Sequence, residues 1–540
     1  MNTHFTDPQL ILVNGKIWSA NRASQNSPTA LAVSGDRIIA VGSDRDMLSL
    51  KKRNTRIIDA RGNRILPGLM DAHTHLSLYA ARKLQIDLTD CTTLPEALHR
   101  IRERVEQADP GSWIVGGGWD YTRWGLEDFP DKRLLDEIST RHFIALQSKD
   151  WHSLWVNSAV LQLCRIDETV EDPPGGAIRR YPGSREPSGV LQERAGEVVY
   201  QSIAPPTLEE IYPALQETFG EFLRLGITGV HSVESPYEFA HYRQLYERGE
   251  LGLRVFWYFP IRFLGREAEE GFGAYRGDHF LKICGVKMFA DGALGSQTAE
   301  MLEPYQGLEH RGVAVMSAEE LEEHIRRSVE QRLACAVHAI GDAANRKVLR
   351  ALGKVAQTSR KAGLRHRIEH AQLLHPDDIP LFARYGVIAS MQPMHLAYDV
   401  PLIERYWGSR GRHAYAWGSL RKSGARLIFG SDTPIETFDP WKGLYAAVAR
   451  KPGNDPAQPS FYPEESIPVE EALAAYTHHS AHAVGEEAHL GSLEPGKLAD
   501  FIAIDRDIFQ APSEILLDTS VLLTVRNGTI AYASEDGLIL

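Results

Sequence analysis

The segment ILPGLMDAHTHL, residues 65–76, carries two histidines, His73 and His75, directly after an apolar run. In an extended strand, side chains at positions i and i+2 point to the same face. Two imidazoles on one face at the end of a strand are a typical beginning of a divalent-metal site. The chain has 21 histidines, so one such pair can arise by chance. The interpretation therefore depends on ligands elsewhere that the same fold brings together.

Strand and helix patterns alternate from residue 63 to residue 491. Amphipathic stretches typical of helices, such as 317–332 and 343–362, lie between several short apolar runs. The runs that are predicted to form strands are 64–70, 227–232, 254–259, 283–289, 335–339, 366–370, 387–391 and 426–430. Alternation of this kind predicts a parallel sheet, and eight strands are the number in a (β/α)8 TIM barrel. We therefore predict an α/β fold with such a barrel over residues 63–491.

The two ends of the chain resemble each other in pattern. LILVNGKIWSA begins at residue 10 and VLLTVRNGTIAYA begins at residue 521. Both contain alternating strands interrupted by an Asn-Gly turn, which is typical of hairpins. We predict that residues 1–62 and 492–540 together form one composite β-sandwich domain.

The first two predicted barrel strands are separated by about 150 residues, whereas an ordinary βαβ crossover needs only a few tens. Residues 80–215 are therefore expected to form an inserted subdomain. It is rich in aromatic residues, namely Trp113, Trp119, Tyr121, Trp124, Trp151 and Trp155. These side chains either form the core of the insertion or belong to a lid over the barrel, and the sequence leaves both open.

Composition excludes several classes of function. The formal charge of −12 and the lack of basic runs argue against nucleic acid as a partner. No stretch approaches the roughly 20 apolar residues that span a bilayer. The N-terminal residues lack the features of a signal peptide, and the four cysteines lack C-x-x-C spacing. We expect a cytoplasmic protein, for which a homodimer is one compatible assembly.

Chemistry in such barrels occurs at the C-terminal ends of the strands. Six polar residues occupy predicted strand ends in this chain: His73, His75, Lys287, His338, His370 and Asp432. Each alone has a structural explanation, such as a hydrogen-bonded core histidine, an Asx turn or a snorkelling lysine. Together they supply the nitrogen and oxygen ligands that zinc prefers. We interpret the six residues as a metal site.

Many segments, in order along nearly the whole chain, resemble the amidohydrolase superfamily of metal-dependent hydrolases. Within it, the chain is similar to the amidohydrolase family 3 branch that includes N-substituted formamide deformylases. The segments include LPGLMDAHTHL, GVKMFADGALGSQTA, HAIGDAANRKVL, RHRIEHAQLL, FGSDTPIETFDPW and GSLEPGKLADFIAID.

The resemblance implies that His73 and His75 bind the more buried of two metal ions, and that His338 and His370 bind the second. In binuclear relatives a lysine on the fourth strand is carboxylated by CO₂ and bridges both ions, and Lys287 matches that position. Zinc is the expected metal, and the sequence leaves open one or two ions per chain.

Asp432 matches the general base of the family as well as a metal ligand. A metal lowers the pKa of bound water toward ~7. A carboxylate within hydrogen-bond reach can orient that water, accept its proton and pass the proton to a leaving nitrogen. The resemblance therefore implies amide hydrolysis without a covalent enzyme intermediate.

The insertion supplies weaker candidates. The segment Asp150-Trp151-His152 resembles a family segment that usually reads Asp-Gly-His. His152 is expected either to bind substrate or stabilise an oxyanion, which would make it a second catalytic residue, or to have a packing role. The other candidate substrate contacts are Trp119, Asp150, Trp151, Glu193 and, outside the insertion, His395.

We therefore predict an enzyme that cleaves a carbon–nitrogen bond of a small, non-peptide amide. The aromatic insertion and the resemblance favour an N-substituted formamide with an apolar or aromatic group. One alternative is a superfamily deaminase of an aminoheterocycle, which usually needs one metal and no lysine on the fourth strand. Another is a non-catalytic scaffold relative, which would be expected to have lost ligands.

Overall fold

The computed structural model describes residues 7–18, 28–149, 152–173, 175–273, 275, 277–535 and 538. The chain divides into two compact units. One consists of Met1–Leu76 together with Glu217–Leu540, and the other of Ser77–Gln216. Each unit has hydrophobic clusters of its own. Among the described residues, no helix is long and apolar enough to cross a membrane.

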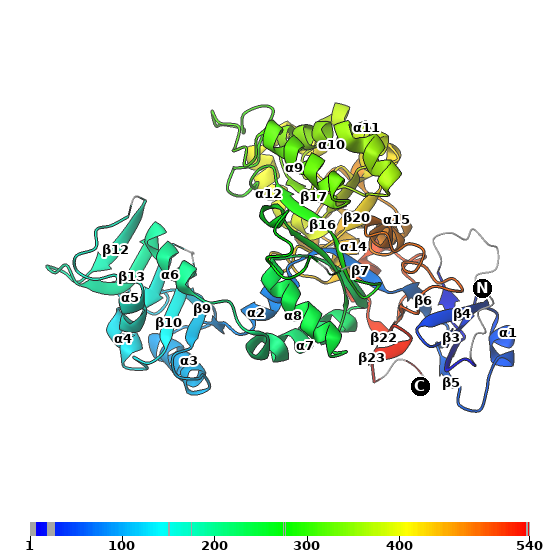
Figure 1. Cartoon of the computed structure of the whole chain (residues 1–540), viewed down its shortest axis with the longest axis horizontal. Helices are drawn as coiled ribbons and strands as arrows, with labels where there is room; N and C mark the ends of the chain where they lie inside the picture. Colours follow the sequence, from blue (N-terminus) through cyan, green and yellow to red (C-terminus); the bar gives the residue numbers. More distant parts are fainter. Residues whose placement is uncertain are drawn as a thin grey trace. The chain divides into compact units, whose positions relative to one another are not determined.

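The first unit contains an eight-stranded parallel sheet (Figure 1). Its strands, in hydrogen-bonded order, are β7 (Leu69–Thr74), β14 (Ile227–Val233), β15 (Arg254–Pro260), β16 (Leu281–Phe289), β17 (Ala334–Ala339), β18 (Arg367–His370), β19 (Ile388–Met391) and β20 (Leu427–Phe429). Parallel strands buried on both faces form near-continuous apolar runs, which is why the sequence revealed them. The predicted (β/α)8 fold is confirmed.

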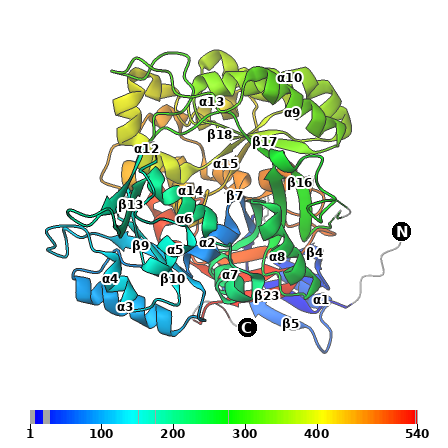
Figure 2. The same ribbon diagram turned by 60° about the vertical axis from the view of Figure 1, so that its left-hand side comes forward.

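Helices connect and surround these strands. Figure 2 shows α9 (Ala318–Glu330) and α10 (Asp342–Ala362) side by side, and both contact β17. The others in this unit are the C-terminal part of α7 (Leu208–Arg224), α8 (Pro236–Glu247), α11 (Ile379–Tyr385), α12 (Pro393–Tyr406), α13 (Trp417–Lys422), α14 (Pro440–Ala449), α15 (Val469–Ala475) and α16 (His478–Ala483). Nearly all of α2 (Leu76–Arg82) belongs to the second unit. Ser317 caps α9 through a capping box with Glu320, which explains where that helix begins.

The predicted first strand, residues 64–70, is wrong in its extent. Residues Arg64–Pro67 form a separate strand, β6, which pairs with β21 (Phe501–Ile504) outside the barrel. Gly68 separates β6 from β7, and a Cβ at this position would lie 2.4 Å from Oγ1 of Thr228. The chain therefore passes from one sheet to the next at a point where only glycine fits. His73 consequently lies within β7.

The two ends of the chain form an additional β-rich domain. One sheet contains β1 (Leu10–Val13), β3 (Ala30–Ser34), β4 (Arg37–Gly42) and β5 (Arg56–Asp59), with α1 (Asp44–Ser49) beside it. The other contains β2 (Lys16–Ile17), β6, β21, β22 (Val521–Arg526) and β23 (Thr529–Ala533). Leu12, Val33, Phe501 and Leu523 share one buried cluster, so residues from both ends complete the same core.

The second unit is a six-stranded mixed sheet with helices on both faces (Figure 1). Its strands are β8 (Ile86–Asp87), β9 (Trp113–Trp119), β10 (Phe143–Ser148), β11 (Ser153–Val156), β12 (Gly176–Arg180) and β13 (Pro187–Glu193). Ile144 and Leu146 pack on α3 (Leu94–Glu106) and α4 (Lys132–Asp136). Ala145, on the opposite face, packs on α5 (Ser158–Leu163) and α6 (Glu197–Ser202).

The barrel closes where the chain beyond β20 meets β7. The N–H of Asp432 donates to the carbonyl of His73 at 2.7 Å, and the N–H of His75 donates to the carbonyl of Thr433 at 2.9 Å. Asp71 accepts from the N–H of Ser431 at 2.9 Å and from the N–H of His73 at 3.1 Å. Burial raises the pKa of Asp71 to about 7. These contacts define the closing seam.

Gly430 allows this close approach, because a Cβ there would lie 2.4 Å from the backbone nitrogen of His73. We expect Gly430→Ala to lower the free energy of unfolding by about 1–3 kcal/mol and to weaken metal binding, as measured by denaturation and metal analysis. Gly220→Ala in α7 is the control, because its Cβ would meet only Nη2 of Arg224 at 3.8 Å. Equal stability of the two variants would contradict the role of the seam.

Candidate active site

Four histidines meet at the C-terminal ends of the barrel strands. Successive ring centroids lie 5.6 Å apart for His73 and His75, 5.2 Å for His73 and His370, and 4.5 Å for His370 and His338. They come from the ends of β7, β17 and β18. β17 and β18 are neighbours in the sheet, whereas β7 pairs with β14, so the rings of His73 and His370 meet although their strands are not adjacent.

Each of these imidazoles has one ring nitrogen engaged by the surrounding protein. Nδ1 of His73 pairs with Glu369 at 2.6 Å, Nδ1 of His75 with the carbonyl of Val233 at 2.8 Å, Nε2 of His338 with the carbonyl of Gly292 at 2.9 Å, and Nδ1 of His370 with Oε1 of Gln392 at 2.7 Å. Acceptors at these nitrogens fix the ring orientation and favour a lone pair on the other nitrogen. That arrangement is the one that metal-ligating histidines adopt.

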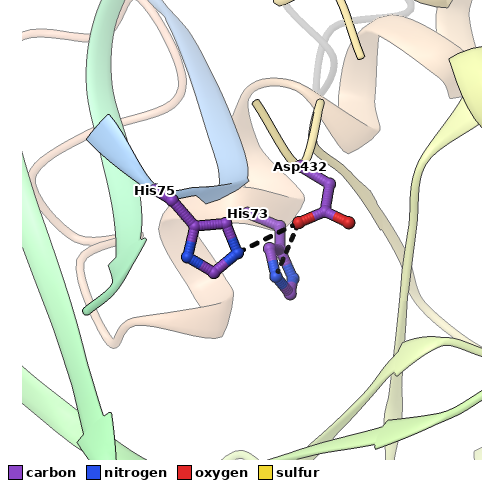
Figure 3. A group of neighbouring side chains, drawn as sticks. All are labelled: His73, His75 and Asp432. Carbon is purple, nitrogen blue, oxygen red and sulfur yellow. Dashed lines mark hydrogen bonds and ion pairs between the residues drawn. The ribbon is translucent and has the colours of Figure 1, made fainter. Parts of the chain in front are cut away.

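Asp432 lies between the histidines (Figure 3). Its Oδ1 is 3.4 Å from Nε2 of His73 and 3.2 Å from Nε2 of His75, and the ligand atoms of the three residues all lie within 4.8 Å of one another. Burial alone would raise the pKa of Asp432, but His73 and His75 hold it well below its usual range. The residue has φ +61°, a strained backbone conformation of the kind that clusters at functional sites.

Asp432 also belongs to a second group with His370 and His395. Nε2 of His395 lies 3.7 Å from Oδ2 of Asp432 and has no hydrogen-bond partner among the described residues. The sequence suggested His395 as a substrate contact. The structure places it with the histidines of the rim, where it offers a further nitrogen ligand.

Lys287 lies at the same rim, almost completely buried. Its Nζ is 3.4 Å from Nε2 of His73 and 5.0 Å from the ring centroid of Phe289. Burial lowers the pKa of Lys287 to about 8. A lysine in this setting has a substantial neutral fraction near neutral pH, and a neutral amine is the form that reacts with CO₂.

Beneath the histidines, a buried polar network crosses the barrel interior. Glu369 accepts from Nδ1 of His73, and its Oε1 lies 2.5 Å from Nε of Arg367. Nη1 of Arg367 donates to His231 at 2.7 Å, and the guanidinium lies 4.0 Å from the ring centroid of Tyr258. Burial would raise the pKa of Glu369, but Arg367 and His73 hold it well below its usual range.

Sequence reasoning missed Glu369, Asp71 and Gln392 as partners of the site. A signal was present for Glu369, because Arg367 and Glu369 alternate within the short strand RIEH, where charged side chains must enter the barrel. For Asp71 and Gln392 no comparable signal exists, since the contacts of Asp71 with Ser431 and of Gln392 with His370 join segments that meet only in the folded barrel.

The candidates from the insertion lie in the second unit. His152 and Glu193 form an exposed pair, with Nδ1 of His152 2.8 Å from Oε1 of Glu193. Trp119 is buried beside Trp155, and its Nε1 donates to the carbonyl of Leu146 at 2.7 Å. Trp119 therefore packs in the core of the second unit, and its role as a substrate contact stays a prediction. Asp150 and Trp151 lie outside the described residues.

The chain matches the profile of the amidohydrolase family over residues 56–532. The chain belongs to the amidohydrolase family. It is 33% identical to the protein YtcJ of Bacillus subtilis over 88% of this chain and 90% of that protein. It is 27% identical to the N-substituted formamide deformylase of Arthrobacter pascens over 97% of this chain and 98% of the relative.

A solved structure is also similar to this chain over most of its length. An uncharacterized metal-dependent hydrolase from Pyrococcus furiosus aligns with a TM-score of 0.77 and 28% identity, over 93% of this chain and all of that one. The protein is thus a metal-dependent hydrolase of the amidohydrolase family that acts on carbon–nitrogen bonds. The imidazole nitrogens of this rim and the carboxylate of Asp432 fit the divalent ion on which this family depends.

We expect Glu369→Gln to weaken metal affinity by about 10–100-fold, because the amide cannot supply the charge that orients His73 and raises its basicity. Competition with a chelator measures the change. Glu465→Gln is the matched control, since Glu465 is also a buried carboxylate but accepts from the N–H of Ser419 at 2.7 Å. Unchanged affinity in Glu369→Gln would contradict the proposed orientation of His73.

Proposed function

We propose that this amidohydrolase hydrolyses small N-substituted amides, with N-substituted formamides as the favoured class. The observation that carries the proposal is the set of four histidines around Asp432 and Lys287, each with one ring nitrogen hydrogen-bonded to an oxygen atom of the surrounding protein. This arrangement supplies ligands for hydrolysis by an activated water.

The residues that would hold metal are His73, His75, Lys287, His338, His370 and Asp432, with His395 as an added candidate from the structure. Zinc suits imidazole and carboxylate ligands. When bound, such an ion supplies Lewis acidity toward water and the amide carbonyl. Carboxylation of Lys287 would convert its amine into an anionic oxygen ligand and so favour a site with two ions.

Asp432 is the proposed general base. Its environment keeps the carboxylate ionised, so it can accept a proton from the attacking water. The same carboxyl group then carries that proton to the leaving nitrogen, which departs as a neutral amine. His75 lies 3.2 Å from Oδ1 of Asp432 and holds this oxygen in place.

Exposed apolar residues near the proposed metal ligands support a substrate with an apolar substituent on its nitrogen. Phe289 and Ile435 are 46% and 60% exposed, although large apolar residues are usually buried, and each lies within three residues of Lys287 or Asp432 in the sequence. The ring centroid of Phe289 lies 5.1 Å from that of His338. The similarity to an N-substituted formamide deformylase favours the same class. His152, with its partner Glu193, remains the proposed oxyanion or substrate contact from the insertion.

The test is a substrate panel on the metal-loaded protein with N-aryl formamides, acyl amino acids, cyclic amides and aminoheterocycles. We expect formate release from N-aryl formamides, and a fall of about 10²–10⁴-fold in turnover for Asp432→Asn at matched metal content. Ammonia release from aminoheterocycles alone would instead indicate the deaminase. Activity confined to small charged amides would contradict the apolar substituent, and full turnover in Asp432→Asn would contradict the general base.

Carboxylation of Lys287 is tested by native mass spectrometry with bicarbonate present. We expect a gain of about 44 Da, the mass of CO₂, that disappears in Lys287→Arg. Lys282 is an internal control on the same strand, because its Nζ is held by Glu486 at 2.5 Å and is not expected to react. Absence of the added mass from protein that carries two ions per chain would contradict carboxylation.

A further inference from the structure

Two cavities lie at the opposite end of the barrel from the histidine rim. They have volumes of about 630 Å³ and 510 Å³ and share Arg426, His479 and His482 as lining residues. Arg426 directly precedes β20, whereas Asp432 follows the other end of this strand. Barrels of this fold carry out catalysis at the C-terminal ends of their strands. The cavities are therefore separate from the proposed catalytic site.

Arg426 differs from the other cations around these cavities. Arg365 is paired with Glu487 at 2.5 Å, Arg421 with Glu471 at 3.5 Å, and Lys497 with Glu494 at 3.6 Å. The half-buried guanidinium of Arg426 has no hydrogen bond or ion pair to any side chain in the part of the chain that the structure describes. A partly desolvated cation without a counter-charge is unfavourable unless something compensates it.

The neighbouring groups do not supply that compensation. Both carboxylate oxygens of Glu487 already accept from Arg365, at 2.5 and 2.6 Å. Burial and the charge of Arg365 lower the pKa of Arg426, and the charge of Glu487 offsets only part of this effect. His479 donates from Nδ1 to the carbonyl of Leu427 at 3.1 Å. Burial lowers the pKa of this histidine to about 3, so at neutral pH it is uncharged.

We propose that Arg426 anchors the carboxylate or phosphate group of a small organic anion whose body occupies one or both cavities. A planar guanidinium binds such oxyanions through two parallel hydrogen bonds. Each cavity is far larger than a bare inorganic ion needs, so the anionic group is one end of a larger molecule. His478, whose Nδ1 is buried without a hydrogen-bond partner among the described residues, lines the smaller cavity beside Arg426.

Isothermal titration calorimetry of the full-length, metal-loaded protein tests the proposal at constant ionic strength. The probes are inorganic phosphate and succinate, which separate the two classes of oxyanion. We expect saturable binding of at least one probe, and a loss of about tenfold or more in affinity for Arg426→Gln, because charge-assisted hydrogen bonds are removed. The matched control is Arg350→Gln, an exposed arginine of α10 that lines neither cavity.

Thermal unfolding without added anion checks the folding of Arg426→Gln, which loses no ion pair and should unfold at or above the temperature of the unaltered protein. An anion bound at the histidine rim would still bind to this variant with full affinity, and that result would overturn the proposal. Absence of saturable binding to the unaltered protein, or equal losses in Arg426→Gln and Arg350→Gln, would overturn it as well.

Discussion

The contact between Glu369 and His73, 2.6 Å long and buried inside the barrel, is the constraint on which the site depends. A carboxylate removed from water is costly unless it is paired and hydrogen-bonded. Arg367 and His73 provide that pairing from two different strands. In return, Glu369 fixes the orientation of His73, whose Nε2 then lies 3.4 Å from both Lys287 and Asp432. The buried carboxylate of Glu369 thus orients His73 as a metal ligand.

Barrel closure and assembly of the site rely on the same hydrogen bonds. The N–H of Asp432 meets the carbonyl of His73, and the N–H of His75 meets the carbonyl of Thr433. A shift of the chain after β20 would therefore separate Asp432 from both histidines. Gly430 and the buried Asp71 allow the two segments to approach this closely. Stability at this seam and geometry at the rim cannot be changed independently.

The residues that flank β20 at its two ends, Arg426 and Asp432, have different proposed roles. Asp432 follows the C-terminal end, where imidazoles surround its ionised carboxylate. Arg426 precedes the N-terminal end, where a cation without a partner faces two cavities. At one end imidazole nitrogens surround the Asp432 carboxylate, and at the other the guanidinium of Arg426 borders two cavities without an ion-pair partner. Such features lower stability in the isolated chain, and bound ligands can compensate them.

The sequence by itself determined the eight strands and the six rim residues, because buried parallel strands are continuous apolar runs and the polar residues at their ends stand out. The predicted first strand was wrong in its extent. One apolar run contains two strands of different sheets, and the break between them falls at Gly68, directly after Pro67. Only the tertiary structure decided the contacts of Glu369, Asp71 and Gln392 with the site, and the burial of Trp119 in the second unit. The hydrophobic pattern of a sequence indicates which side chains are buried. Which of them contact one another depends on how segments distant in the sequence meet in the folded chain.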